Sequence, residues 1–311
     1  IWGAFRQNLQ TLESSPRARR KILMQVAGQG MCRNCMFSIK DQLSLARLGL
    51  GERVSVRHLQ APAEQSDRFL LRLWSSIVAW DLLHQLAAYH RPFEREPGQV
   101  DRVYESYCTT LEQLLARPTR TGLRGARQLG GDARDLLGLV EQAGQRFAEL
   151  ARPTPPSAEA RTVFLSGDIY VRADALASDS LVQRLNERGL HVIVEPVSLF
   201  AEYLAHEGMD ELIRFPRGAR GAMMRGLMRQ IRSVLYRRVT GQHPWLPLPE
   251  LAPVLSASSQ LVQRFPLGET SVTVGSVLHH WHTHRCDGVI TVSPWGCGPA
   301  LAAEGLLAHQ H

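Results

Sequence analysis

Apolar positions along this chain follow two patterns: short continuous runs, and longer stretches with a helical period. The short runs are typical of buried strands and lie at residues 21–27, 52–58, 162–167, 191–196 and in a closing run from Gly288. Helical patterns follow them at residues 33–48, 180–188, 199–207 and 300–307. Gly189 ends one of these helices, as glycine commonly does. Strands that alternate with helices through short connections predict parallel sheets in an α/β protein.

The longest helical region lies between Asp67 and Leu150. Its apolar residues recur at helical spacing, as shown by Phe69, Leu73, Ile77 and Trp80. Pro92 and the pair Pro97-Gly98 interrupt the pattern, because proline cannot continue a helix. We therefore expect a mainly helical insertion made of several helices.

A proline-rich stretch, Arg152–Ser157, is the clearest linker in the chain. The length of 311 residues is sufficient for two domains. The sequence thus predicts an α/β fold with two lobes, each with a parallel sheet. The first lobe comprises residues 1–157, with the helical insertion at 67–150, and the second comprises residues 158–311. The start at Ile1 indicates a fragment or domain of a longer chain.

Composition favours an ordinary globular protein, with 44% hydrophobic and 21% charged residues. No apolar run approaches the roughly 20 residues that span a bilayer. The first twenty residues are polar and arginine-rich and do not resemble a signal peptide, so we expect a cytoplasmic protein without a membrane partner. Lysine occurs only at Lys21 and Lys40, and neither follows a glycine-rich phosphate loop, which excludes a P-loop ATPase.

The five cysteines are the main candidates for chemistry, because an odd number without a secretion signal favours metal or redox use over disulfides. Cys297 lies between two glycines, after a predicted strand and before a helix, where backbone N–H groups and the helix dipole favour the thiolate. Cys32 and Cys35 form a CxxC pair in a similar position. This pair is a metal half-site, a dithiol redox pair or simply two partly buried thiols. Cys108 fits a helical core, and Cys286 is interpreted as incidental.

The carboxyl ends of parallel strands converge on one edge of a sheet, so Cys32 and Cys297 are predicted to meet there. Their sulfurs should lie on the order of 6–7 Å apart if both bind one cubane cluster. Asp168 and Arg172 follow another predicted strand at the same edge. They either orient a ligand or form a buried salt bridge with each other.

Other motifs carry weaker signals. Gly28-x-Gly30 lacks the third glycine of a dinucleotide-binding loop. The histidines between His279 and His284 could bind a metal from one face of a strand or helix, but we interpret them as structural. Residues 214–238 carry eight arginines beside Met224, Met228, Ile231 and Leu235. They predict an amphipathic helix whose basic face either contacts a polyanion or is simply solvated.

Several short motifs, in order along roughly residues 21–308, resemble proteins related to the 2-hydroxyacyl-CoA dehydratases, and more closely the dehydratase-like segment associated with CoA-enzyme activases. The motifs are Arg91-Pro92-Phe93-Glu94 with Gly98, Gly167–Arg172, Leu181-Val182-x-x-Leu185-x-x-x-Gly189, Pro196-Val197-Ser198, Gly268-Glu269 and Pro294–Pro299. The chain departs from the family pattern at Cys35, since Gly-Gln-Tyr tends to follow Cys-Arg in the family, and at Asp168, where relatives tend to have glutamate.

The resemblance implies Rossmann-like domains and a cysteine-bound iron–sulfur cluster of the 4Fe-4S kind. It also implies electron transfer from an ATP-hydrolysing activator of the actin-like kinase fold, a CoA thioester as candidate ligand, and a homodimer or heterodimer. Carried over, Cys32 and Cys297 match the cysteine positions of the family. The leading hypothesis is a redox protein that holds the cluster on Cys32, Cys35 and Cys297, with the remaining ligand unassigned, and the ligand-binding candidates are Arg33, Asp168 and Arg172. No catalytic residue is assigned.

Two other functions remain open from the sequence. One is a non-catalytic binding or scaffold module of a larger activase chain. The other is a binder of nucleic acid or another polyanion through the arginine-rich helix, although no nucleic-acid-binding motif supports it.

Overall fold

The computed structural model describes residues 21–25, 34–58, 67–118, 122–150, 161–207, 218–262 and 268–309. The strands are β1 (Lys21–Gln25), β2 (Val54–His58), β3 (Thr162–Gly167), β4 (His191–Val194) and β5 (Gly288–Val292). The helices of the first half are α2 (Asn34–Arg47), α3 (Asp67–His90), the 3-10 turn η1 (Arg91–Phe93), α4 (Gln99–Leu115) and α5 (Gly122–Leu150). Those of the second half are α6 (Ile169–Ala173), α7 (Leu181–Asn186), α8 (Val197–Glu207), α9 (Gly218–Thr240), α10 (Leu251–Ser258), α11 (Thr270–His282) and α12 (Gly298–Leu307).

The predicted α/β fold with parallel sheets is confirmed, within a mostly helical molecule. One sheet has the strand order β4-β3-β5, and a two-stranded sheet pairs β1 with β2; both are parallel. β3 has the predicted bounds, whereas β4 ends two residues early, so Glu195 and Pro196 form the turn into α8. The predicted linker and the domain boundary at residue 157 lie outside the described residues, and the domain division stays a prediction.

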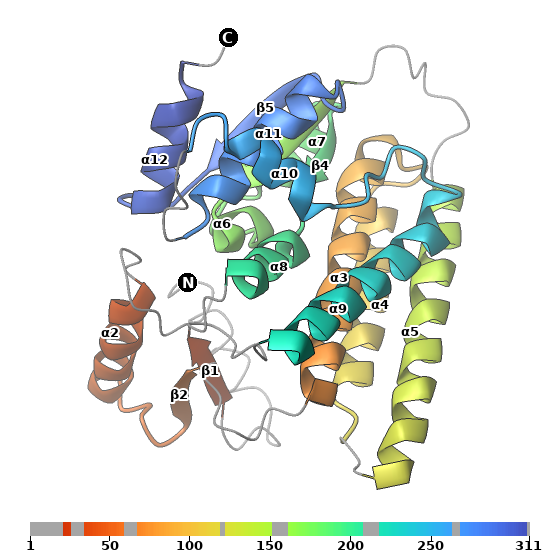
Figure 1. Cartoon of the computed structure of the whole chain (residues 1–311), viewed down its shortest axis with the longest axis vertical. Helices are drawn as coiled ribbons and strands as arrows, with labels where there is room; N and C mark the ends of the chain where they lie inside the picture. The colour runs from red at the N-terminus through yellow and green to blue at the C-terminus, as the bar shows by residue number, and fades with distance from the viewer. Residues whose placement is uncertain are drawn as a thin grey trace.

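Four helices, α3, α4, α5 and α9, form the largest apolar core, and Figure 1 shows them running side by side. The predicted inward residues of α9 are there: Met224, Met228 and Leu235 are buried, and Ile231 is half-buried. The indole of Trp74 on α3 donates a hydrogen bond to the Met228 carbonyl at 2.8 Å. The predicted helical region of the first half therefore shares its core with a helix that lies beyond residue 157.

Helix α3 also joins this core to the three-stranded sheet. Its Ala88 packs with Leu165, Val192 and Val194 on one face of the sheet. The opposite face is covered by α11, where Val277 contacts Phe164 and Ile193. The sheet is thus a layer between helices, as parallel sheets usually are.

Candidate metal centre

Two acidic side chains and one thiol lie close together at the carboxyl edge of the β4-β3-β5 sheet, each at the N-terminus of a helix. Asp168 is the N-cap of α6, directly after β3; Glu269 is the N-cap of α11; and Cys297 is the N-cap of α12, shortly after β5. One ligand atom from each, two carboxylate oxygens and the Cys297 Sγ, lie within 4.8 Å of one another. Such a group could hold a metal ion.

Asp168 is fixed by its backbone surroundings. Its Oδ1 accepts hydrogen bonds from the N–H groups of Tyr170 at 3.0 Å and Val171 at 2.8 Å, the usual role of an aspartate N-cap. The Asp168 N–H donates to the Val292 carbonyl at 2.8 Å and so ties the end of β3 to β5. The preceding Gly167 has a φ of +107°, and a Cβ there would lie 2.1 Å from the Val292 oxygen. Only glycine fits this close approach of two strands.

Cys297 follows a strand and begins a helix, as the sequence predicts. Its carbonyl accepts the N–H of Leu301 at 2.9 Å, and the residue is half-buried. The start of α11 is bound to the start of α12 because Thr270 Oγ1 donates to the Pro299 carbonyl at 2.9 Å. A Cβ on Gly268 would lie 2.6 Å from the Pro299 ring, so glycine also permits this contact. These contacts bring Glu269 to the thiol.

Arg172, predicted at this edge, lies there but does not pair with Asp168. Its guanidinium donates to the carbonyls of Gly167 and Glu195, at the ends of β3 and β4 (2.9 Å to Glu195), and lies 3.3 Å from the Glu195 carboxylate. Ser166 Oγ donates to the same carboxylate at 2.9 Å. Both partners of the ion pair are almost fully buried. The predicted alternative of a salt bridge between Asp168 and Arg172 is therefore wrong, because the buried partner of Arg172 is Glu195.

Negative charge exceeds positive charge around Glu269. Burial, with the charges of Asp168 and Glu195, raises the pKa of Glu269 to about 8, against the opposing effects of Arg172 and the Ile169 N–H. Without a further cation Glu269 is largely protonated at neutral pH, and a cation bound beside it would favour the carboxylate.

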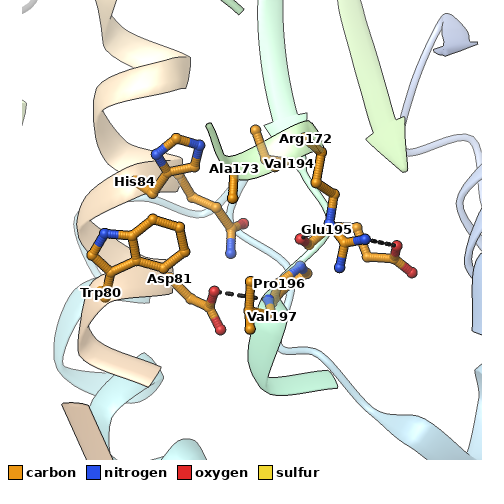
Figure 2. A pocket seen from close by; sticks show the side chains of 10 residues that line it. Trp80, Asp81, His84, Arg172, Ala173, Val194, Glu195, Pro196 and Val197 are labelled. Carbon is orange, nitrogen blue, oxygen red and sulfur yellow. Dashed lines mark hydrogen bonds and ion pairs between the residues drawn. The ribbon is translucent and has the colours of Figure 1, made fainter. Parts of the chain in front are cut away.

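A closed polar junction lies on the side of Arg172 that faces α3, shown in Figure 2. Asp81 accepts the N–H groups of Val197 and Ser198, both at 2.8 Å, and burial raises its pKa to about 6. Burial lowers the pKa of His84 to about 4. The described side chains fill this space too tightly for a water molecule, so the junction positions α8 and does not hold a ligand.

A separate hollow of about 480 Å³ opens at the carboxyl ends of β3 and β5. Hydroxyl groups of Ser178, Thr273, Thr291 and Ser293 line it, together with two carboxylates. None of the described residues around it is a lysine, arginine or histidine. It lies where β3 and β5 end side by side, and the helices that follow these strands, α7 and α12, pack on opposite faces of the sheet, the usual ligand position in open α/β sheets.

The other predicted site residues have different outcomes. Cys32 and Arg33 lie outside the described residues, and so does the side chain of Cys35, whose backbone belongs to α2. The predicted distance between Cys32 and Cys297 is therefore not tested. Cys108 packs against the helical core as expected, and Cys286 packs against the apolar cluster around Phe164.

Among the histidines between His279 and His284, His280 has a structural role. α11 ends at His282, and His280 is buried, with its ring stacked on Phe164 at a centroid distance of 3.8 Å. His280 Nδ1 lies 2.9 Å from the Ser276 carbonyl. This confirms the structural interpretation for His280.

Sequence reasoning missed Glu195 and Glu269 as members of this site. The apolar run at residues 191–196 places Glu195 inside a strand, whereas Pro196, which cannot donate to a strand ladder, is the signal in the sequence that the strand ends nearby. Glu269 entered only through the resemblance, since its approach to Cys297 depends on contacts between distant segments.

Comparisons with protein-family models, with curated proteins and with solved structures find no match. Among the helices of the described residues, none has both the length and the apolar character needed to cross a bilayer.

Proposed function

We propose that this chain is an iron–sulfur redox protein, whose cluster binds at the carboxyl edge of the β4-β3-β5 sheet through Cys297. The observation that carries the proposal is the position of the Cys297 thiol, at a helix N-terminus and beside Asp168 and Glu269. Thiolates hold iron–sulfur clusters, and a helix N-terminus favours the thiolate over the thiol.

One of the described residues fits a cluster, because Cys297 is a half-buried thiol that follows the end of β5 and begins α12. In the specific form of this proposal, Cys32 and Cys35 of the first Rossmann-like lobe would supply further thiolates to a 4Fe-4S cluster.

The bound cluster would supply one-electron chemistry at low potential. Arg172 would hold the ends of β3 and β4 in place through its bonds to Gly167 and Glu195, so that the edge keeps its shape when the charge of the cluster changes. Electrons would come from an ATP-hydrolysing activator, as in the proteins that the chain resembles. A CoA thioester as ligand and a dimeric assembly belong to the same proposal.

Anaerobic purification with iron and acid-labile sulfide analysis tests the proposal. The wild-type chain should contain both, Cys297→Ser should lose iron, and Cys286→Ser should keep it. Cys286 is the matched control because it is half-buried like Cys297 but packs in an apolar cluster. A colourless, iron-free wild-type protein would overturn the proposal and favour the scaffold module.

One observation favours polyanion binding as a second candidate function. α9 contains six arginines and no acidic residue, and Arg229, Arg237 and Arg238 are exposed. Arg232 does not belong to this surface, because it is buried and lies 2.5 Å from Glu202. If α9 binds polyanions, Arg229→Gln with Arg237→Gln should weaken heparin binding and reduce its salt dependence, whereas Arg184→Gln on α7 should not. Equal binding by all variants would exclude this role.

A further inference from the structure

The hollow at the carboxyl ends of β3 and β5 has no role in the proposed redox function. Its volume of about 480 Å³ is within the range of pockets that hold small organic molecules. Its walls come from the ends of β3 and β5, from the turn between α6 and α7, and from the helices α11 and α12. A place where several distant segments meet at a strand end is a common position for a ligand in an α/β protein.

The polar part of this hollow consists of oxygen atoms that accept hydrogen bonds. Four hydroxyl-bearing residues and two acids contribute it: Ser178, Thr273, Thr291, Ser293, Asp179 and Glu304. Ser178 Oγ already donates to the Asp174 carbonyl at 2.9 Å, so this hydroxyl offers a ligand only its lone pairs. A lining that accepts hydrogen bonds and carries negative charge is suited to a ligand that donates and carries positive charge, such as an ammonium group.

Glu304 on α12 is the carboxylate that is available to such a ligand. Asp179 already lies 2.6 Å from the Arg184 guanidinium through its Oδ2, and both of these side chains are largely exposed. Glu304 forms no ion pair in the part of the chain that the structure describes. A bound cation would therefore supply Glu304 with a charge partner that the described residues do not provide.

The backbone donors at this edge are mostly occupied, which argues against a site for anions. The Val171 N–H donates to Asp168, and the Thr273 N–H donates to the Glu269 carbonyl at 2.9 Å. Pro299, in the first turn of α12, has no N–H to donate. An anion at a helix N-terminus depends on such free donors, so the helices that begin here favour an anion in this hollow only weakly.

The wall that carries Ser178 and Asp179 is held in a fixed shape. Asp179 and Ser180 have left-handed φ angles of 52° and 53°, which are uncommon for residues other than glycine. Hydrogen bonds to Asp174 support this turn: its carbonyl accepts the Ser178 N–H at 3.1 Å, and its Oδ1 accepts the Ala177 N–H at 2.8 Å. A preformed wall reduces the entropy that a ligand must overcome on binding.

We infer that this hollow binds a small aliphatic amine, whose ammonium group pairs with Glu304 among the hydroxyl oxygens. The alkyl chain would cover the apolar part of the lining, which includes Val171, Val292 and Ala300. The inference goes beyond the proposed function, because binding of the amine does not require a cluster.

Nuclear magnetic resonance titration of the nitrogen-15-labelled full chain, at low salt and neutral pH, tests the inference. Butylamine, butanol and butyrate serve as probes, because they share one alkyl chain and differ in the charge of the head group. Butylamine should shift the amide signals of Ser178, Ser293 and Glu304, and its affinity should fall as salt is added. Butanol should bind more weakly, and butyrate should not bind.

Two variants and a matched control locate the site. Glu304→Gln should weaken butylamine binding by about three-fold or more, because it removes the charge partner. Glu187→Gln, at an exposed acid that ends α7 outside the hollow, should leave the affinity unchanged. Thr291→Tyr should abolish binding, since its ring would fill the hollow from an exposed position on β5.

Several results would overturn the inference. These are the absence of butylamine binding, equal or tighter binding of butanol or butyrate, and an affinity for butylamine that Glu304→Gln leaves unchanged. Circular dichroism shows whether each variant is folded, and if Thr291→Tyr does not fold, Glu304→Gln decides. A chain that binds butylamine but contains no iron or sulfide defeats the proposed function alone, and a chain with a cluster that does not bind butylamine defeats the inference alone.

Discussion

Arg172→Met should destabilise the protein strongly, because Arg172 is the buried cation at the edge of the sheet. Its side chain is 2% exposed and joins the carbonyl ends of β3 and β4. Methionine fills similar space but makes none of these bonds. The variant leaves Glu195, which is 1% exposed, without its ion-pair partner.

The expected loss follows from the burial of both partners. Removal of one member of a buried ion pair costs about 3–5 kcal/mol, since the other charge remains buried without compensation. That is a large part of the roughly 5–15 kcal/mol by which a domain is stable. A second change, Glu195→Gln, removes the stranded charge, so the double variant should be more stable than Arg172→Met alone.

Equilibrium unfolding in urea, followed by circular dichroism, measures these differences. Arg184→Met is the matched control, because Arg184 forms an exposed ion pair with Asp179 at 2.6 Å and should lose about 1 kcal/mol or less. A loss for Arg172→Met no larger than that of the control would refute the assignment of Arg172 as the buried cation of the edge. A double variant that is less stable than Arg172→Met would refute the same assignment.

Three further predictions concern the framework of the fold. Met228→Asp places a charge in the helical core and should lower the thermal midpoint of unfolding by many degrees. Met223→Asp, on the same helix at a site 68% exposed, should change that midpoint little, and equal effects would contradict the orientation of α9. Gly275→Ala puts a Cβ 2.1 Å from a backbone oxygen of α10 and should cost at least about 1–3 kcal/mol in urea unfolding, so an unchanged midpoint would disprove this helix contact. Burial lowers the pKa of His280 to about 4, so the folded state binds fewer protons than the unfolded state between about pH 4 and 6.5. The free energy of unfolding should therefore be highest above about pH 6.5 and fall by up to about 3 kcal/mol as the pH drops towards 4. Unfolding measured across that range should show a weaker pH dependence in His280→Phe but not in His282→Phe, and identical profiles would rule out the neutral buried histidine.

Helices and strands could be predicted from the sequence wherever the apolar residues followed a single repeat. The apolar run at residues 162–167 defines β3, and the spacing of Met224, Met228 and Leu235 gives the inward face of α9. The same spacing also places an arginine on the buried face. Arg232 comes four residues after Met228 and three before Leu235, so it shares their buried face and must have a partner there.

The candidate site was only partly accessible, because its members come from distant segments. The position of Cys297 after a strand and before a helix could be predicted from its neighbours alone. The approach of Glu269 to that thiol depends on the bond from Thr270 to Pro299 and on the close packing at Gly268, which no periodicity reveals. In the same way, nothing in the sequence linked Asp81 to the start of α8, 116 residues further along the chain.

Anomalous diffraction at the iron absorption edge, from crystals grown without oxygen, locates any iron bound to the chain. If Cys297 holds the cluster, an iron peak should lie about 2.3 Å from Cys297 Sγ, the usual length of a metal–thiolate bond, at the carboxyl edge of the β4-β3-β5 sheet. An iron peak elsewhere in the molecule, or crystals of the anaerobically purified chain that contain no iron, would contradict it.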